Sequence, residues 1–112
     1  MQLISAVVRP TKVSEICDAL QNLGFHGVTV IEATGLGKLR GPTEIYRGTK
    51  YSSEFRQHAK LEIVARDQDV HDMIEVICAV GFTGRMGDGK VWVTPVSDIV
   101  RIRTRELGSD AL

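Results

Sequence analysis

Two stretches of the chain repeat each other: Val8–Gly27 reads VRPTKVSEICDALQNLGFHG, and Ala65–Gly84 reads ARDQDVHDMIEVICAVGFTG. They align without a gap. Apolar residues recur in both at i, i+3, i+4, i+7 and i+10, the spacing of one face of a helix. The matched apolar pairs are Val13 with Val70, Ile16 with Met73, Cys17 with Ile74, Leu20 with Ile77, and Leu23 with Val80. The repeat therefore predicts two equivalent amphipathic helices.

The two predicted helices carry similar end signals. Thr11 and Asp67 stand where a polar side chain can cap the first turn. Both helices close in Gly-Phe-x-Gly, at Gly24–Gly27 and Gly81–Gly84. A glycine directly after the last apolar turn suits a left-handed C-terminal cap, and the phenylalanine that follows can fold back onto the core. We therefore expect the same ending for both helices.

Strand patterns flank each helix. LISAVV (3–8) precedes the first helix and VTVIEA (28–33) follows it, while KLEIVA (60–65) precedes the second and VWVTPV (91–96) follows it. This double β-α-β order predicts an α+β fold of the ferredoxin-like kind, a four-stranded antiparallel sheet with both helices on one face. The other face of such a sheet needs a cover, which suggests association of several copies.

Length and composition exclude several classes of protein. The chain has 112 residues, enough for a single domain spanning 1–112, and is 43% hydrophobic and 25% charged, as soluble globular proteins are. Fourteen basic residues balance fourteen acidic ones, so nothing favours a nucleic acid as partner. No apolar run is long enough for direct membrane insertion, and the first residues lack signal-peptide features, so we expect a cytoplasmic protein. Cys17 and Cys78 lie in the helical patterns and are expected to be small core residues.

Three segments have no counterpart in the repeat: an insert at about 36–56, a loop at about 82–90 and a C-terminal arm at about 97–112. Because the repeated scaffold forms its core without them, we expect function to reside there. Each carries a weak signal for phosphate. Gly84–Lys90 (GRMGDGK) combines glycines with cations, although Val91 replaces the magnesium-binding hydroxyl of a P-loop and a simple turn is the alternative.

The other two segments add similar signals. Val100–Arg105 alternates strictly, so an extended backbone would point its three arginines the same way; the alternative is an edge strand protected by charge. In Gly35–Lys38 a glycine pair allows close approach of the backbone, with a cation attached. Together the three segments favour a bound polyphosphate.

The chain resembles the nitrogen regulatory protein P-II family over essentially its whole length. The strings that carry the resemblance are Thr43–Gly48 with Tyr51, Thr83–Lys90 and Val100–Thr104. The resemblance implies a homotrimer that binds ATP or ADP in clefts between neighbouring subunits, and no enzymatic activity of its own. The insert would be the T-loop, a mobile arm that docks onto a transporter, an enzyme or a regulator, and the 82–90 loop the B-loop.

The resemblance also assigns individual residues. It places Thr29 and Val64 at the adenine. The residues assigned to the phosphates and their surroundings are Gly37, Lys38, Gly87, Asp88, Gly89, Lys90, Arg101 and Arg103. Mg²⁺ would accompany ATP, and no protein residue is assigned to a metal. Tyr51 stands at the position that some members modify, and Arg105 stands where the family usually has glycine.

Two positions depart from the family pattern in a way that bears on 2-oxoglutarate. Leu39 and His58 stand where the family uses a glutamine and a lysine for this ligand. Leucine offers no ligand atom to magnesium, and histidine carries little charge at neutral pH. We therefore expect a weak or absent response to 2-oxoglutarate. The alternatives are an ordinary 2-oxoglutarate-responsive regulator with replaced ligands, a slow ATPase acting as a timer, and a purely structural or metal-binding trimer.

Overall fold

A computed structural model of the chain describes residues 1–36, 44–46, 49–51 and 55–112. The α-helices are α1 (Val13–Asn22) and α2 (Asp67–Gly81), and short 3₁₀ turns η1 and η2 span Pro10–Lys12 and Gly108–Ala111. The strands are β1 (Gln2–Val8), β2 (Thr29–Leu36), β3 (Glu44–Tyr46), β4 (Thr49–Tyr51), β5 (Phe55–Ala65) and β6 (Lys90–Pro95).

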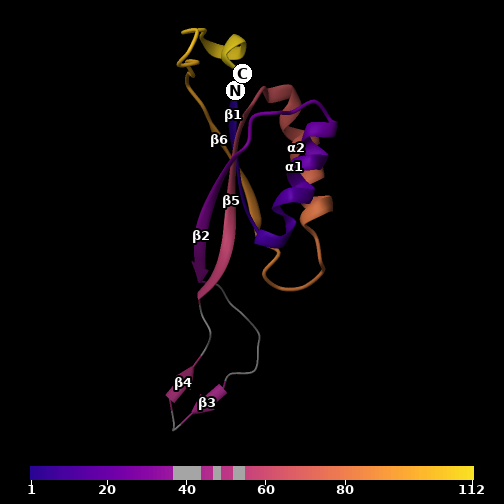
Figure 1. Cartoon of the computed structure of the whole chain (residues 1–112), viewed down its shortest axis with the longest axis vertical. Coiled ribbons are helices and arrows are strands. Elements are labelled where there is room, and N and C mark those ends of the chain that lie inside the picture. Colours follow the sequence, from indigo (N-terminus) through magenta and orange to yellow (C-terminus); the bar gives the residue numbers. More distant parts are fainter. Residues whose placement is uncertain (37–43, 47–48, 52–54) are drawn as a thin grey trace.

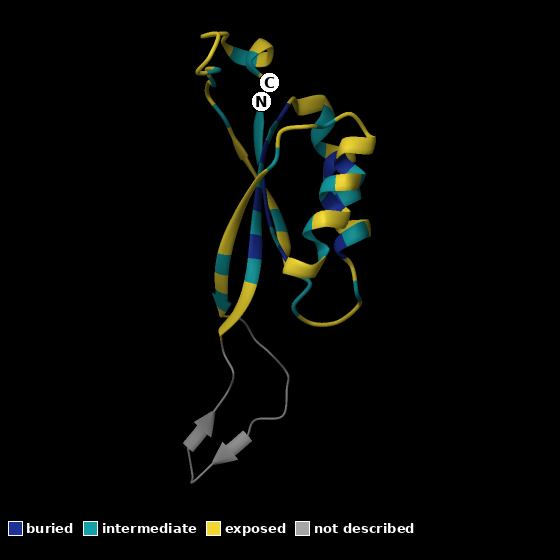
Figure 2. Ribbon diagram, viewed as in Figure 1, coloured by how far each residue is buried: buried dark blue, intermediate teal, exposed yellow. Residues whose placement is uncertain are grey.

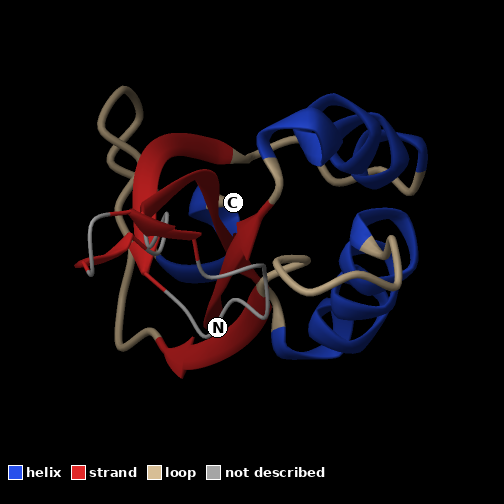
Figure 3. Cartoon of the chain, turned by 90° about the horizontal axis from the view of Figure 1, so that it is seen from below, coloured by secondary structure: helices blue, strands red, loops and turns tan. Residues whose placement is uncertain are grey.

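The main sheet has four antiparallel strands in the order β2-β5-β1-β6. Both helices lie on one face of it, as Figure 3 shows most clearly. This is the ferredoxin-like α+β arrangement predicted from the repeat, so that prediction is confirmed.

The core lies between the two central strands and the helices (Figure 2). Alternate residues of β1 and β5 point toward the helices, which contribute four buried hydrophobic side chains of their own. The buried hydrophobic residues are Ile4, Ala6, Val8, Ile16, Leu20, Ala59, Leu61, Ile63, Ala65, Met73 and Ile77. Four of them, Ile16, Leu20, Met73 and Ile77, belong to the apolar pairs that define the repeat. The helical half of the core was thus readable from the sequence.

The second face of the sheet is not covered by either helix. There Lys60 forms an ion pair with Glu62 at 3.2 Å, and its Nζ lies 5.7 Å from the centre of the Trp92 ring. Ile31 and Trp92 are 41% and 43% exposed on this face. Two large apolar side chains beside an ion pair leave this surface open to a partner, as the sequence suggested.

β2 and β5 continue beyond the other strands and carry the insert between them (Figure 1). β1 pairs with β5 only as far as Val8 and Ala59, whereas β2 and β5 stay paired out to Leu36 and Phe55. Within the insert, β3 pairs with β4. Gly37, Lys38 and Leu39, which the sequence singled out, lie outside the described residues.

The helix ends differ from the predictions. Thr11 lies inside η1 and Asp67 is the first residue of α2, and neither helix has a side-chain cap hydrogen bond. Gly24 does adopt the left-handed conformation, with φ of +90°. Gly81, in contrast, is the buried last residue of α2, where an added Cβ would lie 3.7 Å from Ile16 Cδ1. A Cβ at that distance would make an ordinary van der Waals contact, so Gly81 is neither a left-handed cap nor required by the packing of the helices.

Two side-chain predictions in the second repeat, those for Phe82 and Cys78, are wrong. Phe25 packs against the core as expected, but Phe82 is 69% exposed. In the aligned repeat α2 continues two residues beyond the end of α1, so Phe82 directly follows the helix. Cys78 is exposed, since its neighbour Ile77 takes the core-facing position on the helix, while Cys17 is partly buried. Among the described residues, no helix is both long and apolar enough to cross a membrane.

Candidate functional site

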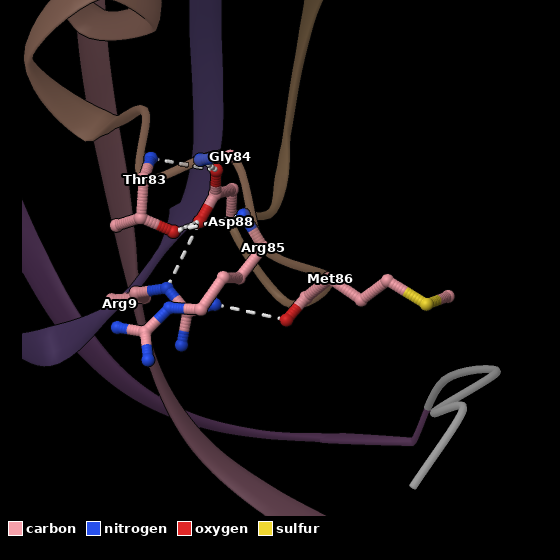
Figure 4. A network of polar contacts seen from close by, with 6 residues as sticks. All are labelled: Arg9, Thr83, Gly84, Arg85, Met86 and Asp88. Atoms are coloured by element: carbon pink, nitrogen blue, oxygen red, sulfur yellow. Dashed lines mark hydrogen bonds and ion pairs between the residues drawn. The ribbon is translucent and has the colours of Figure 1, made fainter.

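The loop that joins α2 to β6 folds around the side chain of Asp88 (Figure 4). Its carboxylate accepts hydrogen bonds from the main-chain N–H of Thr83 at 2.8 Å and of Gly84 at 3.1 Å, and from the Thr83 hydroxyl. Arg9 Nε donates a further hydrogen bond at 3.0 Å to the same carboxylate. These donors, those of Thr83 first, hold the pKa of Asp88 well below its usual range. The ionised Asp88 side chain thus holds the loop in shape by accepting these hydrogen bonds on its inner side.

Two glycines let the loop approach the end of β1. Gly87 and Gly89 have φ of +102° and +99°, a conformation that other residues rarely adopt. A Cβ on Gly89 would collide with the carbonyl oxygen of Val7, so the loop backbone lies directly against β1. At Gly87 a Cβ would come within 3.3 Å of Arg9 Nη2. Gly89 is therefore required by the contact with the β1 backbone, and Gly87 is favoured by its backbone conformation beside Arg9.

The loop offers an anion fewer donors than its sequence suggests. The N–H groups of Thr83 and Gly84 already bind the Asp88 carboxylate. Across the described ranges, the N–H groups of Gly87 and Asp88 have no such acceptor. Of the residues predicted here, Gly87, Asp88, Gly89 and Lys90 do lie together, but Asp88 could face an anion only through its main chain.

A cavity of about 400 Å³ connects this loop to the base of the insert. The loop contributes Met86, Gly87 and Gly89, β6 contributes Lys90 and Trp92, and the remaining lining residues are Val7, Gly35, Leu36, Arg56 and His58. A second hollow, of about 380 Å³, shares Arg56, His58 and Gly87 and adds Arg9. Cationic side chains thus surround an opening with an apolar wall.

Arg9 and Arg56 are site residues that the sequence reasoning missed. Arg56 lies two positions before His58 on β5, and this spacing places both side chains on the same face of the strand. That spacing was visible in the sequence. Arg9 directly follows β1, and its closeness to the loop depends on the pairing of β1 with β6, which no local pattern reveals.

His58 lies against the backbone of β2. A Cβ on Gly35 would come within 3.0 Å of His58 Nδ1, and the same nitrogen is 3.2 Å from the carbonyl oxygen of Arg56. The imidazole is therefore packed against the first residues of the insert base. Gly35 has a defined role here, since it makes room for the ring.

The residues predicted for the adenine lie at the opposite end of the sheet. Thr29 and Val64 line a different cavity of about 580 Å³, together with the C-terminal residues Ile99 and Leu112. On β1, Val64 is paired with Leu3 and Lys90 with Val7. Four residues of strand correspond to about 13 Å. One chain therefore does not bring the two predicted halves of the site into one cavity.

The C-terminal arginines do not form the predicted extended row. The chain folds back at this point: the Arg105 N–H donates to Arg101 O at 2.8 Å, and the Arg101 N–H donates to Glu106 O at 2.9 Å. The Arg101 guanidinium pairs with the Glu106 carboxylate at 3.1 Å and donates to Leu112 O at 2.7 Å. Alternation predicted a strand, but in the described part of the chain no strand pairs with this segment, and the contacts with Glu106 close a turn instead.

The family model for nitrogen regulatory protein P-II matches residues 1–106. The chain belongs to the P-II family. Relatives named nitrogen regulatory protein P-II are 46% identical in Azospirillum brasilense, 45% in Mesorhizobium japonicum and 44% in Rhizobium meliloti, each over 112 residues and the full length of both chains. The resemblance inferred from the motifs is thereby confirmed, and P-II family proteins are regulators of signal transduction.

Within this P-II chain, the structure divides the predicted residues into three groups. The loop group is assembled around Asp88, and Thr29 and Val64 share the second cavity with the arm. Arg101 and Arg103 lie in the C-terminal turn, where Arg101 is already paired. Tyr51 is a residue of β4 in the insert, and its side chain lies outside the described residues. The roles of these residues in binding remain predictions.

Proposed function

We propose that this P-II family member is a non-enzymatic, cytoplasmic signal-transduction protein. It binds ATP or ADP between the copies of a homotrimer and acts on partner proteins through the insert at 36–56. The loop around Asp88 carries this proposal. Gly89 brings its backbone against β1, Lys90 supplies a cation, and the adjoining cavity reaches the base of the insert. A triphosphate needs close main-chain approach together with positive charge.

The separation of the two cavities favours a site shared between copies. Val64 lies about 13 Å along the strand from Lys90, and Thr29 and Lys90 lie on opposite edge strands of the sheet. The open sheet face with Ile31 and Trp92 provides a surface for association. A neighbouring copy could bring its Thr29 end against the loop of the first. Each cleft would then combine the phosphate loop of one subunit with the adenine end of another, and Mg²⁺ would be held by the phosphate oxygens of ATP.

The position of the cavity supports the proposed output. Gly35 and Leu36 on β2, and Arg56 and His58 on β5, form its wall, and they are also the residues from which the insert leaves the sheet. A ligand in this cavity would contact both ends of the insert. Its occupancy could thus shift the insert between conformations, provided that ATP and ADP make different contacts in each.

A weak response to 2-oxoglutarate belongs to the same proposal. The His58 ring is packed on Gly35, and Leu39 offers no metal ligand. Arg56 brings positive charge nearby, which is what the alternative with replaced ligands would need. Titration of 2-oxoglutarate into the Mg-ATP complex by calorimetry separates the two. The proposal predicts no saturable heat, and saturable binding would make this an ordinary 2-oxoglutarate-responsive regulator.

Trp92 provides a direct assay of nucleotide binding. It is the only tryptophan of the chain and lines the cavity beside Gly89 and Lys90. ATP and ADP should each change its fluorescence saturably, and Lys90→Gln should weaken binding more than tenfold, as loss of a charged contact does. Lys12→Gln is the matched control, because Lys12 pairs with Glu15 on the helix side. Absence of any nucleotide-dependent signal, confirmed by calorimetry, would contradict the proposal.

A further inference from the structure

We propose that Arg9 is the positioning residue of the loop Thr83–Lys90, fixing from the end of β1 the conformation in which the loop backbone can face an anion. The claim that an anion binds at this loop rests on the proposed function. The positioning role of Arg9 is independent of it, because it concerns the protein without ligand.

One guanidinium holds both sides of Gly87. Arg9 Nε donates to Asp88 Oδ1 at 3.0 Å, and Arg9 Nη2 donates to the carbonyl oxygen of Met86 at 2.9 Å (Figure 4). The Arg9 and Asp88 side chains are only 22% and 24% exposed. Nη2 also packs directly on Gly87, where a Cβ would approach it to 3.3 Å. Arg9 therefore contacts three consecutive residues of the loop.

The hydrogen bonds from Arg9 differ from the other side-chain hydrogen bonds of the loop, because their donor lies outside the loop. The bonds of Asp88 to Thr83 and Gly84, and that of Arg85 N–H to the Thr83 hydroxyl, join residues within the loop. Among the described side-chain hydrogen bonds of residues 83–90, those from Arg9 alone come from elsewhere in the chain. The internal bonds give the loop its shape, whereas Arg9 ties that shape to the sheet.

The chemistry of the contact requires arginine. A guanidinium presents several N–H donors in a fixed plane and can reach a carboxylate and a carbonyl at once. A lysine would keep the charge but has one nitrogen at the end of a flexible stem. Because Asp88 already neutralises the Arg9 cation, the arginine acts on the loop through Asp88 and Met86 and needs no direct contact with an anion.

Hydrogen exchange of the loop amides in protein free of nucleotide tests the positioning role. Arg9→Lys should make the hydrogen-bonded amides of Thr83, Gly84 and Arg85 exchange at least about tenfold faster, as expected for loss of one charge-assisted hydrogen bond, while amides of β1 and β5 keep their rates. Asp88→Asn breaks the ion pair from the other side and should accelerate the same segment. Arg85→Lys is the matched control for exchange, because the guanidinium of Arg85 makes no hydrogen bond in the described part of the chain.

Unchanged exchange of the loop amides in Arg9→Lys would overturn the proposal, whatever Asp88→Asn does, because Asp88 also accepts hydrogen bonds from within the loop. ATP affinity, measured by calorimetry on the same variants, gives the second readout. Positioning predicts that Arg9→Lys weakens ATP binding although the charge is kept. Full ATP affinity in Arg9→Lys would show that the tie is not needed for binding and would overturn the functional part. If the wild-type protein bound no ATP, the proposed function would fail, while the exchange result would still decide the role of Arg9.

Discussion

Replacement of Gly89 by alanine tests how closely the loop Thr83–Lys90 approaches β1. Gly89 has φ of +99°, and the added Cβ would collide with the Val7 carbonyl oxygen and come within 2.7 Å of its carbon. The left-handed conformation costs alanine about 1–2 kcal/mol. Displacing backbone in a packed region costs about 1–3 kcal/mol more. We therefore expect Gly89→Ala to lower the free energy of unfolding by about 2–5 kcal/mol, or Tm by roughly 8–20 °C.

Two other glycines separate these contributions. Gly24 has a similar φ of +90° but open space around its Cβ position, so Gly24→Ala should show the conformational cost alone. Gly27 has open space and no such φ, so Gly27→Ala should change stability by less than about 0.5 kcal/mol. Gly27→Ala should be the most stable of the three variants, Gly24→Ala should be intermediate, and Gly89→Ala should be the least stable.

Urea unfolding followed by circular dichroism measures all three variants. Protein concentration must be identical throughout, because association makes apparent stability depend on concentration. A Gly89→Ala protein as stable as Gly24→Ala would refute the reasoning, since it would mean that the loop backbone does not contact β1 as described.

Three further predictions concern the same region and the arm. Asp88→Asn should be less stable than wild type by a constant amount above about pH 5, and this difference should shrink as pH falls through 3.8, because a carboxylate with a lowered pKa stabilises the fold only while it is ionised. Urea unfolding from pH 2 to 7 measures the difference. A difference that grows in acid would contradict the prediction. Gly35→Ala should lower the free energy of unfolding by less than about 1.5 kcal/mol, and by less still when His58 is also replaced by alanine, because the new Cβ lies 3.0 Å from the imidazole ring. A double-mutant cycle that shows no coupling between the two positions would exclude the contact. Arg105→Gly should raise stability by about 0.5–1 kcal/mol, because Arg105 holds a φ of +61°, and a lower Tm in calorimetry would show that the arginine side chain contributes more than its backbone costs.

Much of the fold could be predicted from the repeat because the helices and strands are encoded by local periodicity. The apolar residues at Ile16 and Met73, or at Leu20 and Ile77, occupy equivalent core positions in the two helices. The same assumption of equivalence failed at the helix ends. Gly81 and Gly24 look alike in sequence, but α2 continues to Gly81, which is buried, whereas Gly24 lies outside α1 and adopts a φ of +90°.

The site was predicted in part for a similar reason. Gly87–Lys90 form a continuous string, so their proximity needs no knowledge of the fold. Arg9 and Asp88 are 79 residues apart and meet because β1 is the neighbour of β6. The C-terminal arginines misled for the opposite reason: their alternation is a strand signal, yet the partner that decides their conformation is Glu106, only a few residues away.

A complementation experiment tests most directly the central claim, that nucleotide binds between copies of this chain. Lys90→Gln removes the cation of the loop, and Arg103→Gln removes an arginine of the arm that is predicted to face the same phosphates. Each variant alone should bind ATP weakly. When the two variants are unfolded together and refolded as a mixture, about one quarter of the clefts would combine an intact loop with an intact arm, if subunits associate at random.

Calorimetric titration of ATP into the refolded mixture counts the tight sites. The account predicts that tight binding returns at about a quarter of the wild-type number of sites per chain, and that it is absent when the two variants are mixed without refolding. A refolded mixture with no tight sites, although it assembles like wild type, would place both residues in one copy and contradict a shared site.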